Sequence, residues 1–180
     1  MLIAVTVGVI NSCVPSENPL YDPEHIVVDD RLVGEWWQPK GETPWAISRG
    51  KGDDYELNMI DRGGEGRFLC KLVKLDDKLF LDVRPDERHT MKHVSLMYRF
   101  LMHPTHSFFY IREIAPALQM APLDTEWLKR FINDHPSEVS YRNDERDSSI
   151  VVLTMQTKAL QAFVIKHLDA FSDFSEMKKK

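Results

Sequence analysis

Apolar and polar residues alternate along the stretch Gly66–Pro85, and this pattern predicts a β-hairpin. Side chains in a strand point to opposite faces in turn, so short runs of period two are typical of strands. The pair Asp76-Asp77 interrupts the pattern, and aspartate tolerates the positive φ of a tight turn. The alternating residues are Phe68, Cys70 and Leu72 on one face, Leu69, Val73 and Leu75 on the other, and Leu79, Leu81 and Val83 on one face after the turn.

Similar short apolar runs, bounded by turn residues, predict further strands on both sides of this hairpin. The run from Ser149 to Leu153 is mostly apolar, and Ile150, Val151 and Val152 are β-branched, which favours a strand in the middle of the sheet. The other expected strands are Arg31–Trp37, Trp45–Ser48, Tyr55–Met59, His93–Met102, Ser107–Ile114 and Ala117–Ala121.

Two segments in the C-terminal half have helical periodicity instead. Asp124 is a suitable N-cap for the first, and Pro136 ends it. The second runs from about Thr157 to Leu168, where apolar residues recur at i, i+3, i+4, i+7 and i+8. The apolar stripes are Trp127, Leu128, Phe131 and Ile132 in the first helix and Leu160, Phe163, Val164, His167 and Leu168 in the second.

These elements predict one mainly β domain over residues 31–180, with antiparallel strands and two accessory α-helices in the C-terminal half. The chain has 180 residues, 43% hydrophobic and 28% charged, which is enough for one globular core. The net charge is −5, so the chain lacks the excess of basic residues that is typical of a protein that binds nucleic acid. Lys178, Lys179 and Lys180 are expected to be a solvated terminus.

The N-terminal residues have the composition of a secretion signal. Leu2–Ile10 is uniformly apolar or small, too short to span a bilayer, and no Lys or Arg precedes it, so the true start of the chain lies upstream or the segment serves another purpose. Residues 1–12 are interpreted as a signal peptide and residues 13–30 as a flexible tether. The alternative is a first core strand with a buried, unmodified Cys13.

The segment Ile10-Asn11-Ser12-Cys13 resembles a bacterial lipobox, in which the cysteine receives lipid and becomes the mature N-terminus. The resemblance implies an envelope protein, anchored to the membrane through Cys13 and facing the periplasm or the cell surface. Val14, rather than Asp, follows the cysteine, so we expect the outer membrane in preference to the inner one.

The triplet Gly34-Glu35-Trp36 is similar to the opening of lipocalins. Together with the lipobox it resembles a group of uncharacterised bacterial lipoproteins that have a lipocalin-like domain. The resemblance implies a tethered β-barrel and no known activity. Its further stretches are Asn18-Pro19-Leu20, Lys71–Leu75 with Lys78–Asp82, Ala121–Leu128, and Leu153-Thr154 with Thr157 and Leu160–Phe163.

The sequence contains no convincing catalytic or metal-binding constellation, and no cofactor is expected. Four of the seven histidines, His89, His93, His103 and His106, lie in one short span. Residues i and i+4 of a strand lie about 13 Å apart, so zinc binding by this group is not expected. Cys70 lies within an apolar strand and is interpreted as a buried, inert thiol.

Aromatic residues suggest a binding function. The hypothesis is a cavity for a small apolar or amphipathic ligand, lined by Trp36, Tyr98, Phe100, Phe108 and Tyr110. The alternative is a filled barrel that acts as a structural or protein-interaction module of the cell envelope. That alternative predicts an exposed apolar patch around Trp36, Trp37 and Trp45.

Overall fold

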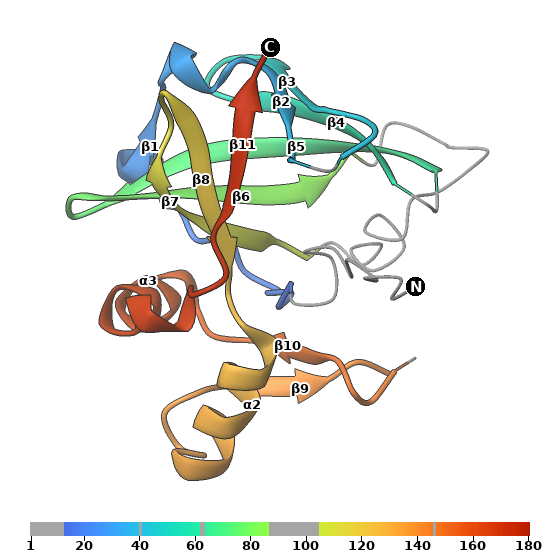
Figure 1. The fold of residues 1–180 in the computed structure, drawn as a ribbon. Helices are drawn as coiled ribbons and strands as arrows, with labels where there is room; N and C mark the ends of the chain where they lie inside the picture. The colour runs from blue at the N-terminus through green and yellow to red at the C-terminus, as the bar shows by residue number, and fades with distance from the viewer. Residues whose placement is uncertain (1–12, 40, 62–63, 87–104, 146) are drawn as a thin grey trace, which may run out of the picture.

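The computed structural model describes residues 13–39, 41–61, 64–86, 105–145 and 147–180. They form a closed antiparallel barrel of eight strands, and two helices and a small hairpin pack against the outside of its wall (below the barrel in Figure 1). The predicted fold class is thus confirmed. The strands are β1 (Ile26–Val27), β2 (Gly34–Trp37), β3 (Trp45–Arg49), β4 (Tyr55–Asp61), β5 (Gly64–Leu75), β6 (Lys78–Pro85), β7 (Ser107–Glu113), β8 (Ala117–Pro122), β9 (Tyr141–Asn143), β10 (Val151–Leu153) and β11 (Ser175–Lys179).

The strands follow the order β5-β4-β3-β2-β11-β8-β7-β6, and β6 pairs again with β5 to close the barrel. Strand β5 is the longest, with 12 residues. Its first part pairs with β4, and its second part pairs with the two-residue strand β1. The predicted hairpin is β5–β6, and Asp76 has the positive φ of 52° that its turn requires.

The last strand, β11, closes the barrel between β8 and β2. The side chains of Lys178 and Lys179 are exposed, as expected of a solvated terminus. Their backbones are not free, because both residues pair with β2 and Lys178 also pairs with β8. Met177 is the one apolar residue of this strand, and it is fully buried. A strand with a single apolar side chain gives almost no hydrophobic pattern, which is why the sequence did not predict it.

Two hydrophobic cores lie on opposite sides of the β5–β6–β7–β8 wall. Residues of one parity, such as Phe68, Leu81 and Phe109, point into the barrel. Residues of the other parity, such as Val73 and Phe80, point outward into a second core beneath the helices. The wall therefore separates two apolar regions, and the central parts of β6, β7 and β8 are buried on both faces.

The second core is covered by helices α2 (Thr125–Asp134) and α3 (Thr157–Lys166) and by the β9–β10 hairpin. Asp124 caps α2 as predicted, since its side chain accepts hydrogen bonds from the backbone N–H groups of Glu126 and Trp127. The prediction that residues 149–153 form a central strand is wrong, because β10 pairs with β9 outside the barrel. All three of its residues are nevertheless buried, so its sequence looks like that of a central strand.

The segment Cys13–Tyr21, called here the N-terminal strap, lies between the barrel and the β9–β10 hairpin. The N–H of Ser16 donates to the carbonyl of His106 at 2.8 Å, and the N–H of Glu17 donates to that of Leu153 at 2.9 Å. The sequence predicts a flexible tether over residues 13–30. The strap instead packs between the two sheets, because its apolar residues Val14 and Leu20 enter the second core.

Candidate functional site

A buried carboxyl group holds the strap to the outer face of the barrel wall. Asp82 lies in β6, and its side chain is 2% exposed. Its Oδ1 lies 2.6 Å from Nδ1 of His106, at the start of β7, and its Oδ2 accepts the backbone N–H of Leu20 at 2.8 Å. Both oxygens therefore have partners, as a carboxyl group removed from water requires.

Polar groups continue from this pair along the outer wall. The Tyr21 ring meets the His106 ring edge-on, with centroids 6.2 Å apart. The ammonium of Lys71 lies 5.6 Å from the centre of the Tyr21 ring and 2.6 Å from Oδ1 of Asp54. Burial raises the pKa of Tyr21, and the negative charge of Asp82 raises it further. Tyr21 is therefore a neutral hydroxyl at physiological pH.

An aspartate that orients an imidazole is also the arrangement found in hydrolytic triads. Such a site needs a nucleophile within hydrogen-bonding reach of the histidine. Within the described part of the chain, the His106 side chain contacts Asp82 and Tyr21, and no serine or cysteine side chain is bonded to it. The hydroxyl of Ser16, the nearest along the strap, donates to the carbonyl of Asn18 at 2.8 Å. We therefore interpret Asp82 and His106 as an anchor for the strap.

The three described residues among those predicted to line a ligand cavity lie in two different cores. Trp36 lies inside the barrel, and its indole N–H donates to the carbonyl of Leu32 at 2.8 Å. Phe108 and Tyr110 point outward and belong to, or pack against, the second core. Tyr98 and Phe100 lie outside the described residues. Strand β7 has aromatic residues at both parities, so its sequence could not indicate which face is interior.

Large side chains occupy the interior of the barrel instead. The rings of Trp45 and Phe109 pack edge to face, with centroids 6.0 Å apart. Two of the three tryptophans that were predicted to form an exposed patch are buried, since Trp36 is 1% and Trp45 is 7% exposed. The bulkiest interior residues are Trp36, Trp45, Tyr55, Phe68 and Phe109, joined by Met59, Met120 and Met177.

Both cysteines are unpaired and buried in this interior. Burial raises the pKa of the Cys13 thiol to about 11, against a smaller opposing effect of the Ser107 hydroxyl. Burial also raises the pKa of Cys70 well above its usual range. Lipid attachment at Cys13 stays a prediction. A sulfur that carries lipid would have to leave the position that it occupies here.

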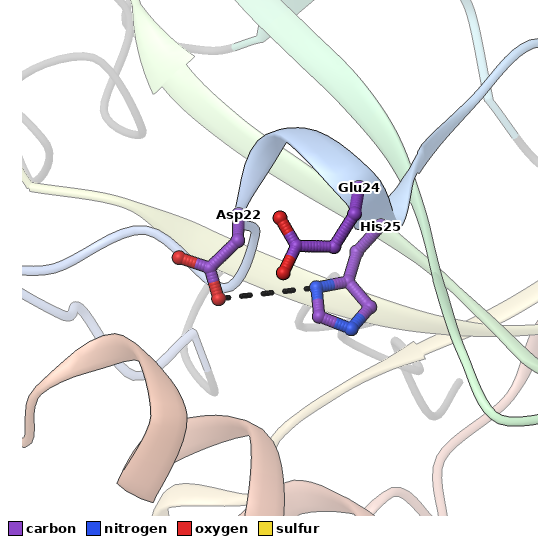
Figure 2. Close-up of side chains that lie close together, drawn as sticks. All are labelled: Asp22, Glu24 and His25. Carbon is purple, nitrogen blue, oxygen red and sulfur yellow. Dashed lines mark ion pairs between the residues drawn. The ribbon is translucent and has the colours of Figure 1, made fainter.

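Of the four histidines that lie in one short span of the sequence, the structure describes one. His106 is bonded to Asp82, and His89, His93 and His103 lie outside the described residues. A different group of possible metal ligands follows the strap, and the sequence analysis missed it: Asp22, Glu24 and His25 (Figure 2). Its only signal in the sequence is the short run Asp-Pro-Glu-His, which also fits a solvated linker.

Comparisons of the chain with protein-family models, with curated proteins and with solved structures found no match. Among the helices within the described ranges, none is both long and apolar enough to cross a membrane. The proposed function therefore rests on the sequence, the fold and the geometry of the site.

Proposed function

We propose that this chain is a lipid-anchored protein of the bacterial cell envelope whose filled, lipocalin-like barrel serves as a rigid structural or protein-interaction module. The observation that carries the proposal is the occupation of the barrel interior by large side chains, among them Trp36, Phe68 and Phe109. An eight-stranded barrel is just wide enough to be filled by side chains or to hold one small ligand. The packing of these rings favours the filled form.

The anchoring part of the proposal rests on the N-terminal sequence. The apolar run Leu2–Ile10 and the segment Ile10–Cys13 have the order of a lipoprotein signal. If Leu20 keeps its bond to Asp82 and residues 13–20 extend, Cys13 reaches roughly 25 Å from the wall, at ~3.3–3.6 Å per residue. A lipid on Cys13 would then hold the barrel close to the membrane surface, on the periplasmic or outer side.

A second candidate function is the binding of a small apolar or amphipathic ligand in the barrel. The specific observation in its favour is the presence of Met59, Met120 and Met177 in the interior. Methionine has an unbranched, flexible side chain that repacks readily around a guest. On this alternative, the methionines would move aside to make room for the ligand.

Native mass spectrometry of the full chain, purified from its own host in mild detergent, separates the two functions. A mass with no small molecule bound supports the filled module, whereas a retained apolar molecule that is released on denaturation contradicts it. The variant Phe109→Ala sharpens the test. In a filled barrel this change destabilises the protein by about 3–5 kcal/mol, and in a hollow one by much less.

Anchoring and interaction need separate measurements in the host. Metabolic labelling with radioactive palmitate should mark the wild-type chain and leave Cys13→Ser unlabelled. A photo-crosslinking residue at Ile60, which is 57% exposed, should give one defined envelope adduct. The matched control carries the photo-crosslinking residue in place of Glu126, which is exposed on α2. Unlabelled wild type contradicts the anchor, and identical adduct patterns at both positions contradict a specific interaction surface.

A further inference from the structure

We propose that Asp22, Glu24 and His25 form a binding site for a divalent transition-metal ion, with Zn²⁺ as the best fit. The three residues lie on η2 (Pro23–His25) and its N-cap, directly after the strap. Figure 2 shows both carboxylates and the imidazole on the same side of this turn. The inference is independent of the proposed function, since it concerns the outer surface and neither the barrel interior nor the lipid.

The distances between the ligand atoms favour a shared ion. One atom from each of the three side chains lies within 4.8 Å of the others. His25 Nδ1 is already 3.9 Å from Asp22 Oδ2. Tetrahedral Zn²⁺, with bonds of about 2.0–2.1 Å, requires ligand atoms about 3.3 Å apart. Small side-chain rotations therefore suffice, and the backbone can stay in place.

The backbone that carries these ligands is fixed on both sides. The N–H of His25 donates to the carbonyl of Asp22 at 3.0 Å, which closes the turn. Leu20, two residues before Asp22, is fully buried and bonded to Asp82. After the turn, Ile26 pairs with β5 in the barrel. A site on a fixed turn loses little conformational entropy when the ion binds.

Helix α3 supplies a neighbouring group from a distant part of the sequence. The amide nitrogen Nε2 of Gln161 lies 3.4 Å from both Asp22 Oδ2 and His25 Nδ1, and it donates to the carbonyl of Leu20 at 3.0 Å. With an ion bound, this amide remains placed to donate to the Asp22 carboxylate. Hydrogen bonds of this kind orient metal ligands and strengthen binding.

The set of donor atoms selects the class of ion. One imidazole nitrogen and two carboxylate oxygens are ligand types that Zn²⁺ accepts, and three protein ligands leave the fourth tetrahedral position for water. Ca²⁺ takes six to eight oxygen ligands, and this site offers carboxylates from Asp22 and Glu24 alone. Two carboxylates also balance the charge of a divalent ion. A bound ion would join the end of the strap rigidly to the start of β1.

Zinc titration of the full chain, stripped with EDTA, tests the site. Competition with a chromogenic chelator should show wild-type binding of Zn²⁺, and Co²⁺ should give the absorption of a tetrahedral complex. His25→Ala and Glu24→Gln should each weaken Zn²⁺ binding by at least about tenfold. Zn²⁺ should also raise the Tm of the wild type and leave that of His25→Ala unchanged, because an ion stabilises only the state that binds it.

His135→Ala is the matched control. His135 pairs with Glu138 at i,i+3 and 3.6 Å, much as His25 pairs with Asp22, but among the described residues no third ligand atom joins that pair. Its loss should leave Zn²⁺ binding unchanged. A wild type that takes up no Zn²⁺, a His25→Ala variant that binds like the wild type, or a preference for Ca²⁺ would each overturn the proposal.

Discussion

The imidazole Nδ1 of His106 lies 2.6 Å from the carboxyl Oδ1 of Asp82, on the outer face of the barrel wall and beneath the N-terminal strap. The second carboxyl oxygen accepts the N–H of Leu20, so one buried side chain joins β6, the start of β7 and the strap. Because both oxygens are used, the loss of this carboxyl group would leave two polar groups without partners in an apolar region.

Asp82→Ala should destabilise the protein by about 1–3 kcal/mol for each of the two groups that lose their partner, the imidazole of His106 and the N–H of Leu20. Asp77→Ala is the control, since its carboxylate is 79% exposed and its contact with Lys78 lies in solvent. That change should stay within about 0.5 kcal/mol. Urea unfolding of both variants measures the difference, and equal midpoints would contradict an anchoring role for Asp82.

Cys13 should resist alkylation in the folded chain that carries no lipid. Its pKa of about 11 leaves almost no thiolate at pH 8, and the sulfur is buried in the barrel. Iodoacetamide should modify Cys13 of the wild type only after unfolding, as measured by mass spectrometry. In Asp82→Ala, where the strap has lost its anchor, Cys13 should be modified faster than in the wild type. Rapid labelling of the folded wild type at Cys13 would show that the strap does not occupy this position.

Gly34→Ala should destabilise the barrel by about 1–3 kcal/mol. Gly34 has a φ of +145°, which residues with side chains rarely adopt, and an added Cβ would collide with Cε of Lys179. The lysine end is flexible, so the backbone conformation should dominate the cost. The double variant with Lys179→Ala distinguishes the causes by thermal unfolding: full recovery of the wild-type Tm would mean that the lysine contact, and not the backbone, sets the penalty.

Stability should fall as the pH drops below about 6.5, in part because of His167. Burial lowers the pKa of His167, and the adjacent Lys166 lowers it further. The unfolded chain then takes up the proton before the folded one. His167 therefore makes its full contribution to the free energy of unfolding above the ordinary histidine pKa of 6.5. That contribution is lost as the pH falls through the lower pKa that His167 has in the folded protein.

His167→Phe should keep the ring packing against Phe131 and Phe163, whose centroids lie 4.6 and 4.9 Å from that of His167. Urea unfolding between pH 7.5 and 5 should give a smaller loss of stability for this variant than for the wild type, on the linkage argument above. His135→Phe, at an exposed histidine, is the control for a general effect. Parallel pH profiles for wild type and His167→Phe would contradict the assignment.

Deletion of residues 175–180 should abolish cooperative folding. Strand β11 supplies the pairing to both β8 and β2, so its loss opens the barrel and exposes two strand edges. Lys178→Ser, at a side chain that is 76% exposed, keeps the strand and should unfold like the wild type. Circular dichroism on heating measures both. A truncated chain with an unchanged, sharp transition would mean that β11 does not close the barrel.

The candidate sites show what the sequence could and could not predict. Residues 14–30, which include most of the strap, contain three prolines and five acidic residues, and this composition is that of a linker. The strap is nevertheless buried, because Val14 and Leu20 pack in the second core. That core forms only when the helices pack against the barrel wall. The Asp82–His106 pair is separated by 24 residues along the chain. No local pattern could have joined them.

By itself, the sequence determined the local elements, because each depends on neighbouring residues. The β5–β6 hairpin follows from alternation over 20 residues, and the start of α2 follows from Asp124. Only the tertiary structure decided which parity of β7 faces inward, that β11 completes the barrel, and that Asp22, Glu24 and His25 converge. Those outcomes depend on long-range pairing and on burial against distant segments, which the order of residues does not display.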